Sequence, residues 1–234
     1  MDARRFLSAL WANIYLIIIV LVVYASMVSV SYALRAERPK APPLDVVFVF
    51  DTTGSMSDKI QGLLHISSRF GSVLDSTGSD YRIAMVTFGA IEDGPVVHKT
   101  FGPSNDLAAF QTFLRNVDID SGGTEDQPTA MRYAMDNMTF RPNTRKFLIL
   151  VTDEELQGQI SMQPGNPTPT DEWNGIIQEL IKRKHTAYAV CIPEEPYMQL
   201  ATRTGGKFYD AEQGEDFTDI LMGIAQDINA SITR

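Results

Sequence analysis

The chain has 234 residues, of which 44% are hydrophobic and 21% are charged, as is usual for a globular protein and unlike a disordered one. The formal net charge is −9, and because residues 1–40 carry +3, residues 41–234 carry −12. Such an acidic domain is a poor candidate for nucleic-acid binding, so we expect no nucleic-acid partner.

The first feature along the chain is an apolar run from Phe6 to Tyr32 that contains no charged side chain. It exceeds the roughly 20 residues that cross a bilayer, so we predict a cytoplasmic leader and a transmembrane helix over residues 1–35. The run is also longer than the apolar part of a signal peptide, although Ser31-Tyr32-Ala33 resembles a cleavage site. Basic residues flank the run in nearly equal number on both sides, so the positive-inside rule is nearly balanced. We favour a cytoplasmic N-terminus because a short positive leader before a long apolar run is the usual form of a signal anchor. We therefore expect a single-pass membrane protein whose soluble domain is extracytoplasmic, either periplasmic or extracellular.

Small residues recur at four-residue spacing near the end of this run, at Ala25, Ser29 and Ala33. Such a face lets helices approach closely within a lipid bilayer, which predicts self-association or packing against other membrane subunits. Small residues are also common in membrane helices that do not pair. Three prolines in residues 36–44 indicate a stiff linker, and one domain is predicted over residues 45–234.

Beyond the linker, strand-like and helix-like segments alternate. We predict strands at 45–50, 81–88, 96–101, 146–152, 186–192 and 207–209, and helices at 58–75, 106–116, 128–138, 171–184, 196–204 and 215–232. The alternation predicts an α/β fold with a doubly wound, Rossmann-like, mostly parallel six-stranded sheet and helices on both faces, in addition to the transmembrane helix. The connection between the second and third strands is too short for a crossover helix, so we expect 96–101 to be an antiparallel edge strand.

The first predicted strand ends in the motif Asp51-Thr52-Thr53-Gly54-Ser55-Met56-Ser57. A carboxylate at Asp51 and hydroxyls at Thr53 and Ser55 are oxygen ligands that suit a small hard cation such as Mg²⁺. The carboxyl ends of strands are also where open α/β sheets place their ligands. Taken alone, the same loop could be a tight turn with a serine that caps the next helix.

Two further loops are expected at the same edge of the sheet. One contains paired glycines before Thr124, and glycines let a backbone pass close to a site. The other contains Asp153, directly after a very apolar strand. Taken alone, the Gly-Gly-Thr segment could be an ordinary loop, and Asp153 could cap a helix. The three loops in this order favour a shared site. Asp118 and Asp120, just before the second loop, are interpreted as solvated charges rather than as a second cation site.

With these three loops, the sequence resembles the von Willebrand factor A family over residues 44–232. The resemblance implies a metal-ion-dependent adhesion site whose ligands are Asp51, Thr53, Ser55, Thr124 and Asp153. Asp126 is an alternative ligand in the second loop, because many relatives carry an aspartate two residues before the proline that opens the helix. The family usually has serine where this chain has Thr53, and threonine keeps the hydroxyl.

The resemblance implies metal-dependent protein–protein interaction, in which an acidic residue of a partner protein completes the coordination of Mg²⁺, or of Mn²⁺ or Ca²⁺. We expect the domain to work within a membrane complex and not to be an enzyme. One alternative is a structural subunit of a multi-subunit membrane assembly that does not depend on the metal. Another is an aspartyl-phosphate phosphotransfer enzyme with Asp51 as nucleophile. Thr53 counts against it, because phosphatases of that kind usually have a second aspartate there.

Overall fold

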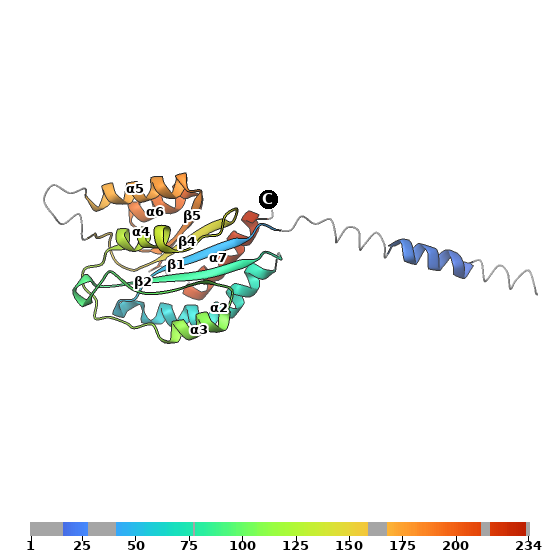
Figure 1. Cartoon of the computed structure of the whole chain (residues 1–234), viewed down its shortest axis with the longest axis horizontal. Helices are drawn as coiled ribbons and strands as arrows, with labels where there is room; N and C mark the ends of the chain where they lie inside the picture. The colour runs from blue at the N-terminus through green and yellow to red at the C-terminus, as the bar shows by residue number, and fades with distance from the viewer. Residues whose placement is uncertain (1–15, 28–40, 77, 159–167, 212–215, 233–234) are drawn as a thin grey trace, which may run out of the picture. The chain divides into compact units, whose positions relative to one another are not determined.

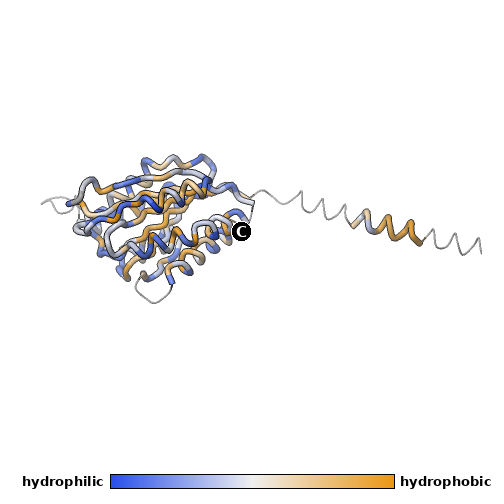
Figure 2. Tube along the Cα trace, turned by 90° about the horizontal axis from the view of Figure 1, so that it is seen from below, coloured by the Kyte–Doolittle hydropathy of each residue, from blue (hydrophilic) through white to orange (hydrophobic). Residues whose placement is uncertain are grey.

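The computed structural model describes residues 16–27, 41–76, 78–158, 168–211 and 216–232. Its contacts divide the chain into two units, residues 1–40 and residues 41–234, and each unit is described by itself. In the first unit, residues 16–27 form a helix of mostly hydrophobic residues (Figure 2). Its side chains are exposed. Ala25 lies in this helix, whereas Ser29 and Ala33 lie outside the described residues.

The predicted transmembrane helix is not found. Among the described residues, no helix is both long enough and apolar enough to cross a membrane. The transmembrane part of the predicted fold class is therefore wrong, and so is the predicted location as a single-pass membrane protein with an extracytoplasmic domain.

The second unit is built on a six-stranded sheet with strand order β3-β2-β1-β4-β5-β6. The strands are β1 (Leu44–Asp51), β2 (Tyr81–Phe88), β3 (Val97–Ser104), β4 (Arg145–Val151), β5 (His185–Cys191) and β6 (Phe208–Asp210). All neighbouring strands are parallel except β3, which pairs antiparallel with β2 at the edge of the sheet. The antiparallel edge strand is thus confirmed, because a short connection can only return the chain in the opposite direction.

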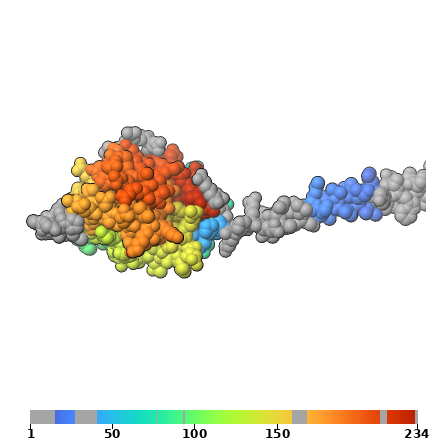
Figure 3. Space-filling view, turned by 90° about the horizontal axis from the view of Figure 1, so that it is seen from above, coloured from blue at the N-terminus to red at the C-terminus, as the bar shows by residue number. Residues whose placement is uncertain are grey.

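Helices cover both faces of this sheet (Figure 1). They are α2 (Ser57–Asp75), α3 (Leu107–Arg115), α4 (Gln127–Asn137), α5 (Pro169–Lys182), α6 (Glu195–Thr204) and α7 (Phe217–Ile232). Helices α4, α5 and α6 pack on one face, which Figure 3 shows from outside, and α2, α3 and α7 pack on the other. Two layers of helices therefore exclude water from both sides of the central strands.

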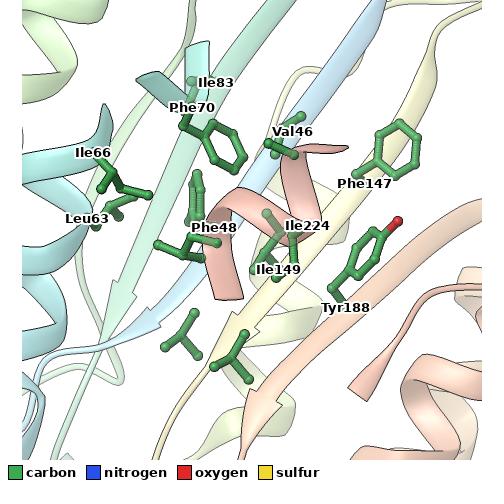
Figure 4. Close-up of a cluster of buried hydrophobic side chains, with 14 of the residues drawn as sticks. Val46, Phe48, Leu63, Ile66, Phe70, Ile83, Phe147, Ile149, Tyr188 and Ile224 are labelled. Carbon is green, nitrogen blue, oxygen red and sulfur yellow. The ribbon is translucent and has the colours of Figure 1, made fainter. Parts of the chain in front are cut away.

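Strand β1 shows how the sequence produces these layers. Successive side chains of a strand point to opposite faces, and both faces of β1 are buried, which explains its unbroken apolar run. Phe48 lies in the core with Phe70 of α2 and Ile224 of α7 (Figure 4). Val47 and Val49 belong to the opposite core, which α4, α5 and α6 complete.

The strand order places a topological switch point between β1 and β4. From β1 the chain builds outward to β2 and β3 on one side, and it then crosses to β4 and builds outward to β6 on the other. Neighbouring connections diverge at such a point, which leaves a crevice outside the carboxyl ends of the two strands. The loops after β1 and β4, which contain Asp51 and Asp153, meet at this crevice.

Candidate metal centre

Asp51, the last residue of β1, is fully buried and is fixed by hydrogen bonds from both sides. Its Oδ1 accepts from the backbone N–H and from the hydroxyl of Thr53, each at 2.8 Å. Its Oδ2 accepts from the hydroxyl of Thr152, also at 2.8 Å. A carboxylate that bonds the backbone two residues ahead forms an Asx turn, so the local sequence itself aims Asp51 into the crevice.

The chain of polar contacts continues from Asp51 to the surface. The hydroxyl oxygens of Thr53 and Ser55 are 3.5 Å apart, and the Ser55 hydroxyl donates to Asp153 Oδ1 at 2.9 Å. The other oxygen of Asp153 pairs with Lys59 Nζ at 3.2 Å. Four of the five predicted ligands, Asp51, Thr53, Ser55 and Asp153, are therefore connected in one cluster that runs from the core to solvent.

The fifth predicted ligand, Thr124, is placed differently. Its backbone N–H donates to Glu92 Oε2 at 2.9 Å, and its carbonyl accepts from the N–H of Ile91 at 2.9 Å. Within the described residues, the Thr124 hydroxyl makes no hydrogen bond to the first or third loop. These backbone contacts fix the second loop to the connection between β2 and β3, and Thr124 as a metal ligand stays a prediction.

Asp126, the alternative ligand, caps helix α4. It is the N-cap residue, and its two carboxylate oxygens accept from the N–H of Thr129 at 2.9 Å and from the Thr129 hydroxyl at 2.8 Å. An aspartate at this position satisfies backbone donors that the first turn of the helix leaves unpaired. The capping role accounts for Asp126 without a metal.

The residue between these two, Glu125, is the one that the sequence analysis missed. Its side chain is buried, and its Oε2 lies 3.5 Å from the Thr152 hydroxyl, which donates to Asp51. Burial raises the pKa of Glu125 to about 10, and the neighbouring Asp51 adds to that rise. Burial also raises the pKa of Asp51. Because Asp51 already accepts three hydrogen bonds, we assign the proton of the pair to Glu125.

Asp120 has a structural role, so its interpretation as a solvated charge is wrong. Its two oxygens accept from the N–H groups of Ala90, at 3.0 Å, and of Gly122, at 3.1 Å. Gly122 has φ +81°, a conformation that suits glycine. Asp120 therefore ties the second loop to the connection between β2 and β3. Asp118 is exposed, as expected, and pairs with Lys99.

The residues at this edge suit a hard divalent cation. Among the described residues, no three His, Cys, Asp or Glu side chains are grouped so as to hold a metal by themselves, so the donors here are a mixture of hydroxyl and carboxylate oxygens. Oxygen donors of this kind suit Mg²⁺. Asp51 and Glu125 also lie buried side by side, and none of the ion pairs found among the described residues involves either of them. A cation at this point could take the place of the proton that Glu125 holds.

The fold and this cluster define a doubly wound α/β domain with an oxygen-lined site at its switch point. The chain belongs to the von Willebrand factor type A domain family, whose model matches residues 45–222. No curated protein matches the sequence.

Solved structures with the same fold are distant in sequence. Proximal thread matrix protein 1 (PTMP1) of the mussel byssus is 18% identical with a TM-score of 0.53, over 80% of this chain and 45% of PTMP1. The pilus adhesin SpaC of Lactobacillus rhamnosus GG is 16% identical with a TM-score of 0.57, over 83% of this chain and 31% of SpaC. BatB of Bacteroides thetaiotaomicron is 13% identical with a TM-score of 0.56, over 82% of this chain and 100% of BatB. A second PTMP1 structure has zinc in its MIDAS motif.

Proposed function

We propose that this domain binds a divalent cation at the carboxyl edge of its sheet and uses the cation to engage an acidic group of a partner protein. The observation that carries the proposal is the connected cluster of Asp51, Thr53, Ser55 and Asp153 at the switch point. Ser55 is exposed at the outer end of the cluster, where a carboxylate from a partner can approach. The predicted ion is Mg²⁺, with Mn²⁺ and Ca²⁺ as alternatives, and the zinc in the MIDAS motif of PTMP1 adds a fourth ion to test.

We also propose that the domain is not an enzyme. A phosphotransfer nucleophile needs a carboxylate oxygen that can reach its substrate, but Asp51 is fully buried and both of its oxygens accept hydrogen bonds. The surroundings of Asp51 instead suit a residue that orients hydroxyl ligands, or binds a cation, from the interior.

Cation binding is tested first, by thermal and urea unfolding of the full chain in EDTA and in each of the four ions. An ion at 100 times its dissociation constant should raise the free energy of unfolding by about 2.7 kcal/mol. Ser55→Ala should lose most of this increment, because Ser55 contributes a predicted ligand at the open end of the cluster. Ser57→Ala, which changes an exposed hydroxyl two residues away, is the matched control and should keep the increment. Equal stability of the wild type in EDTA and in all four ions would contradict the proposal.

Partner engagement is tested with the immobilised full chain as bait. Proteins retained in Mg²⁺ should elute with EDTA, and Ser55→Ala bait should not retain them. A partner that remains bound in EDTA, and that binds both baits equally, would instead support the alternative role as a structural subunit that does not depend on the metal.

A further inference from the structure

We propose that Glu125 supplies the second loop's ligand to the cation, in place of Thr124 or Asp126. This inference rests on the proposed cation binding and adds a residue to that site. The family resemblance points to Thr124 and leaves Asp126 as the alternative. The structure turns the side chain between them toward Thr152, whose hydroxyl donates to Asp51.

The first step of the argument is where each carboxyl or hydroxyl group lies. Glu125 is 1% exposed and its Oε2 lies 3.5 Å from the hydroxyl of Thr152, which also donates to Asp51 Oδ2 at 2.8 Å. Asp51 is itself joined to Thr53 by two hydrogen bonds of 2.8 Å. Glu125 therefore reaches the inner end of the cluster from the second loop. Asp126, by contrast, has both oxygens directed to Thr129 at the start of α4.

The second step is that the protein holds Glu125 in this position. Its backbone pairs with Ala90 in an isolated antiparallel bridge, and its N–H donates to Gln157 Oε1 at 3.2 Å. Gln127 Nε2 lies 3.5 Å from Glu125 Oε2, and Gln127 Oε1 accepts from the N–H of Gln157 at 3.0 Å. Two glutamine side chains thus brace both the backbone and the carboxyl group, as supporting residues do for metal ligands.

The third step is electrostatic. Two carboxyl groups buried in contact are unfavourable unless a cation or a shared proton lies between them. A divalent cation held by Asp51, Glu125 and Asp153, together with the hydroxyls of Thr53 and Ser55, would displace the proton of Glu125 and meet three negative charges. Lys59, which pairs with Asp153, would bring the sum with the cation to zero. The second loop therefore contributes charge as well as an oxygen atom, and ligand charge raises the affinity for a hard cation.

The test compares three variants of the full chain by calorimetric titration with Mn²⁺ and with Mg²⁺, and by the free Mn²⁺ signal in electron paramagnetic resonance. Glu125→Gln keeps the shape of the side chain and removes its charge, and it should weaken Mn²⁺ binding by about tenfold or more. Thr124→Val removes the hydroxyl of the residue that the resemblance favours, and it should bind within about threefold of the wild type. Glu155→Gln removes an exposed negative charge from the same edge and is the matched control.

The outcomes separate this inference from the proposed function. If the wild type binds Mn²⁺ and Glu125→Gln binds it equally well, Glu125 is not a ligand and the cation site itself stands. If Thr124→Val loses binding and Glu125→Gln does not, the residue suggested by the resemblance is the ligand and our assignment is overturned. If the wild type binds none of the ions, the proposed function fails first. Unfolding of each variant in EDTA shows that a loss of binding is not a loss of folding.

Discussion

Asp45 and Asp51 lie near opposite ends of the same strand, β1, and both are buried, but their surroundings differ in charge. Asp45 Oδ1 pairs with Arg82 Nε at 3.0 Å and with Arg141 Nε at 2.9 Å. Burial alone would raise the pKa of Asp45, but hydrogen bonds and charge from the two arginines outweigh it and hold that pKa below its usual value. No such cation reaches Asp51, and its pKa is raised.

The difference distinguishes a structural carboxylate from a candidate functional one. At the amino edge of the sheet the protein supplies its own cations, so the charge of Asp45 is balanced once the chain folds. At the carboxyl edge Asp51 and Glu125 lie together, and the nearest ion pair among the described residues, Lys59 with Asp153, lies at the outer rim. Burial therefore does not identify a binding residue, whereas burial without a partner of opposite charge does.

The largest expected effect contrasts the two aspartates directly. Asp45→Asn leaves two arginines facing an uncharged amide, and it should lower the free energy of unfolding by about 3 to 5 kcal/mol, with or without a divalent cation. Asp51→Asn in EDTA should cost less, because it leaves no buried arginine or lysine without its partner. It should, however, abolish the stabilisation by the cation. Urea unfolding measures both, and Asp118→Asn, at an exposed carboxylate, is the control.

Asp45→Asn should still respond to the cation by the full increment, because the two ends of β1 are about 20 Å apart and distant sites contribute additively. If Asp45→Asn loses the cation response as well, the two edges are coupled and the comparison does not hold.

The next prediction contrasts the two edges of the sheet through the pH dependence of the free energy of unfolding. His185 begins β5 at the amino edge, is 5% exposed, and packs against Phe140 with ring centroids 4.8 Å apart. Burial, followed by the positive charges of Lys146 and Arg183, lowers the pKa of His185 to about 4. Burial and the positive charges at the amino edge thus keep His185 neutral. At the carboxyl edge, burial and the neighbouring Asp51 keep Glu125 protonated.

The sign of the pH effect follows from that shift. Between about pH 6.5 and pH 4 the unfolded chain binds a proton at residue 185 and the folded chain does not, so stability falls as pH falls through this window. The loss should reach about 2 to 3 kcal/mol at pH 4. His185→Phe keeps a ring against Phe140 and should flatten this part of the pH profile. His65→Gln, at an exposed histidine, should leave it unchanged. Equal slopes for His185→Phe and the wild type would refute the assignment.

The sequence was sufficient for the parts of the molecule that depend on local pattern. The central strands were recognisable because burial on both faces gives unbroken apolar runs, and Asp51 and Asp153 because each follows such a run at the switch point. Glu125 was not recognisable, because its inward orientation depends on a bridge to Ala90 and on a distant glutamine, Gln157.

The smallest expected effect concerns Lys59, which pairs with Asp153, one of the predicted ligands. Its ammonium group lies 3.2 Å from Asp153 Oδ2, with both side chains less than one fifth exposed. A fixed positive charge beside a ligand opposes a divalent cation, so Lys59→Met should tighten Mg²⁺ binding by about fivefold, equivalent to about 1 kcal/mol. The gain should shrink as salt is added, because a pair this close to solvent is screened.

The same substitution should weaken the binding of an acidic partner, because without Lys59 the site and its bound cation carry a net negative charge, which repels a further carboxylate. Lys182→Met is the matched control, since it removes a lysine from an exposed pair within α5 and should change neither affinity. Calorimetry with Mg²⁺ and then with the partner measures the two opposite shifts. If Lys59→Met moves both affinities in the same direction, Lys59 supports the fold of the loop and does not balance the charge of the site.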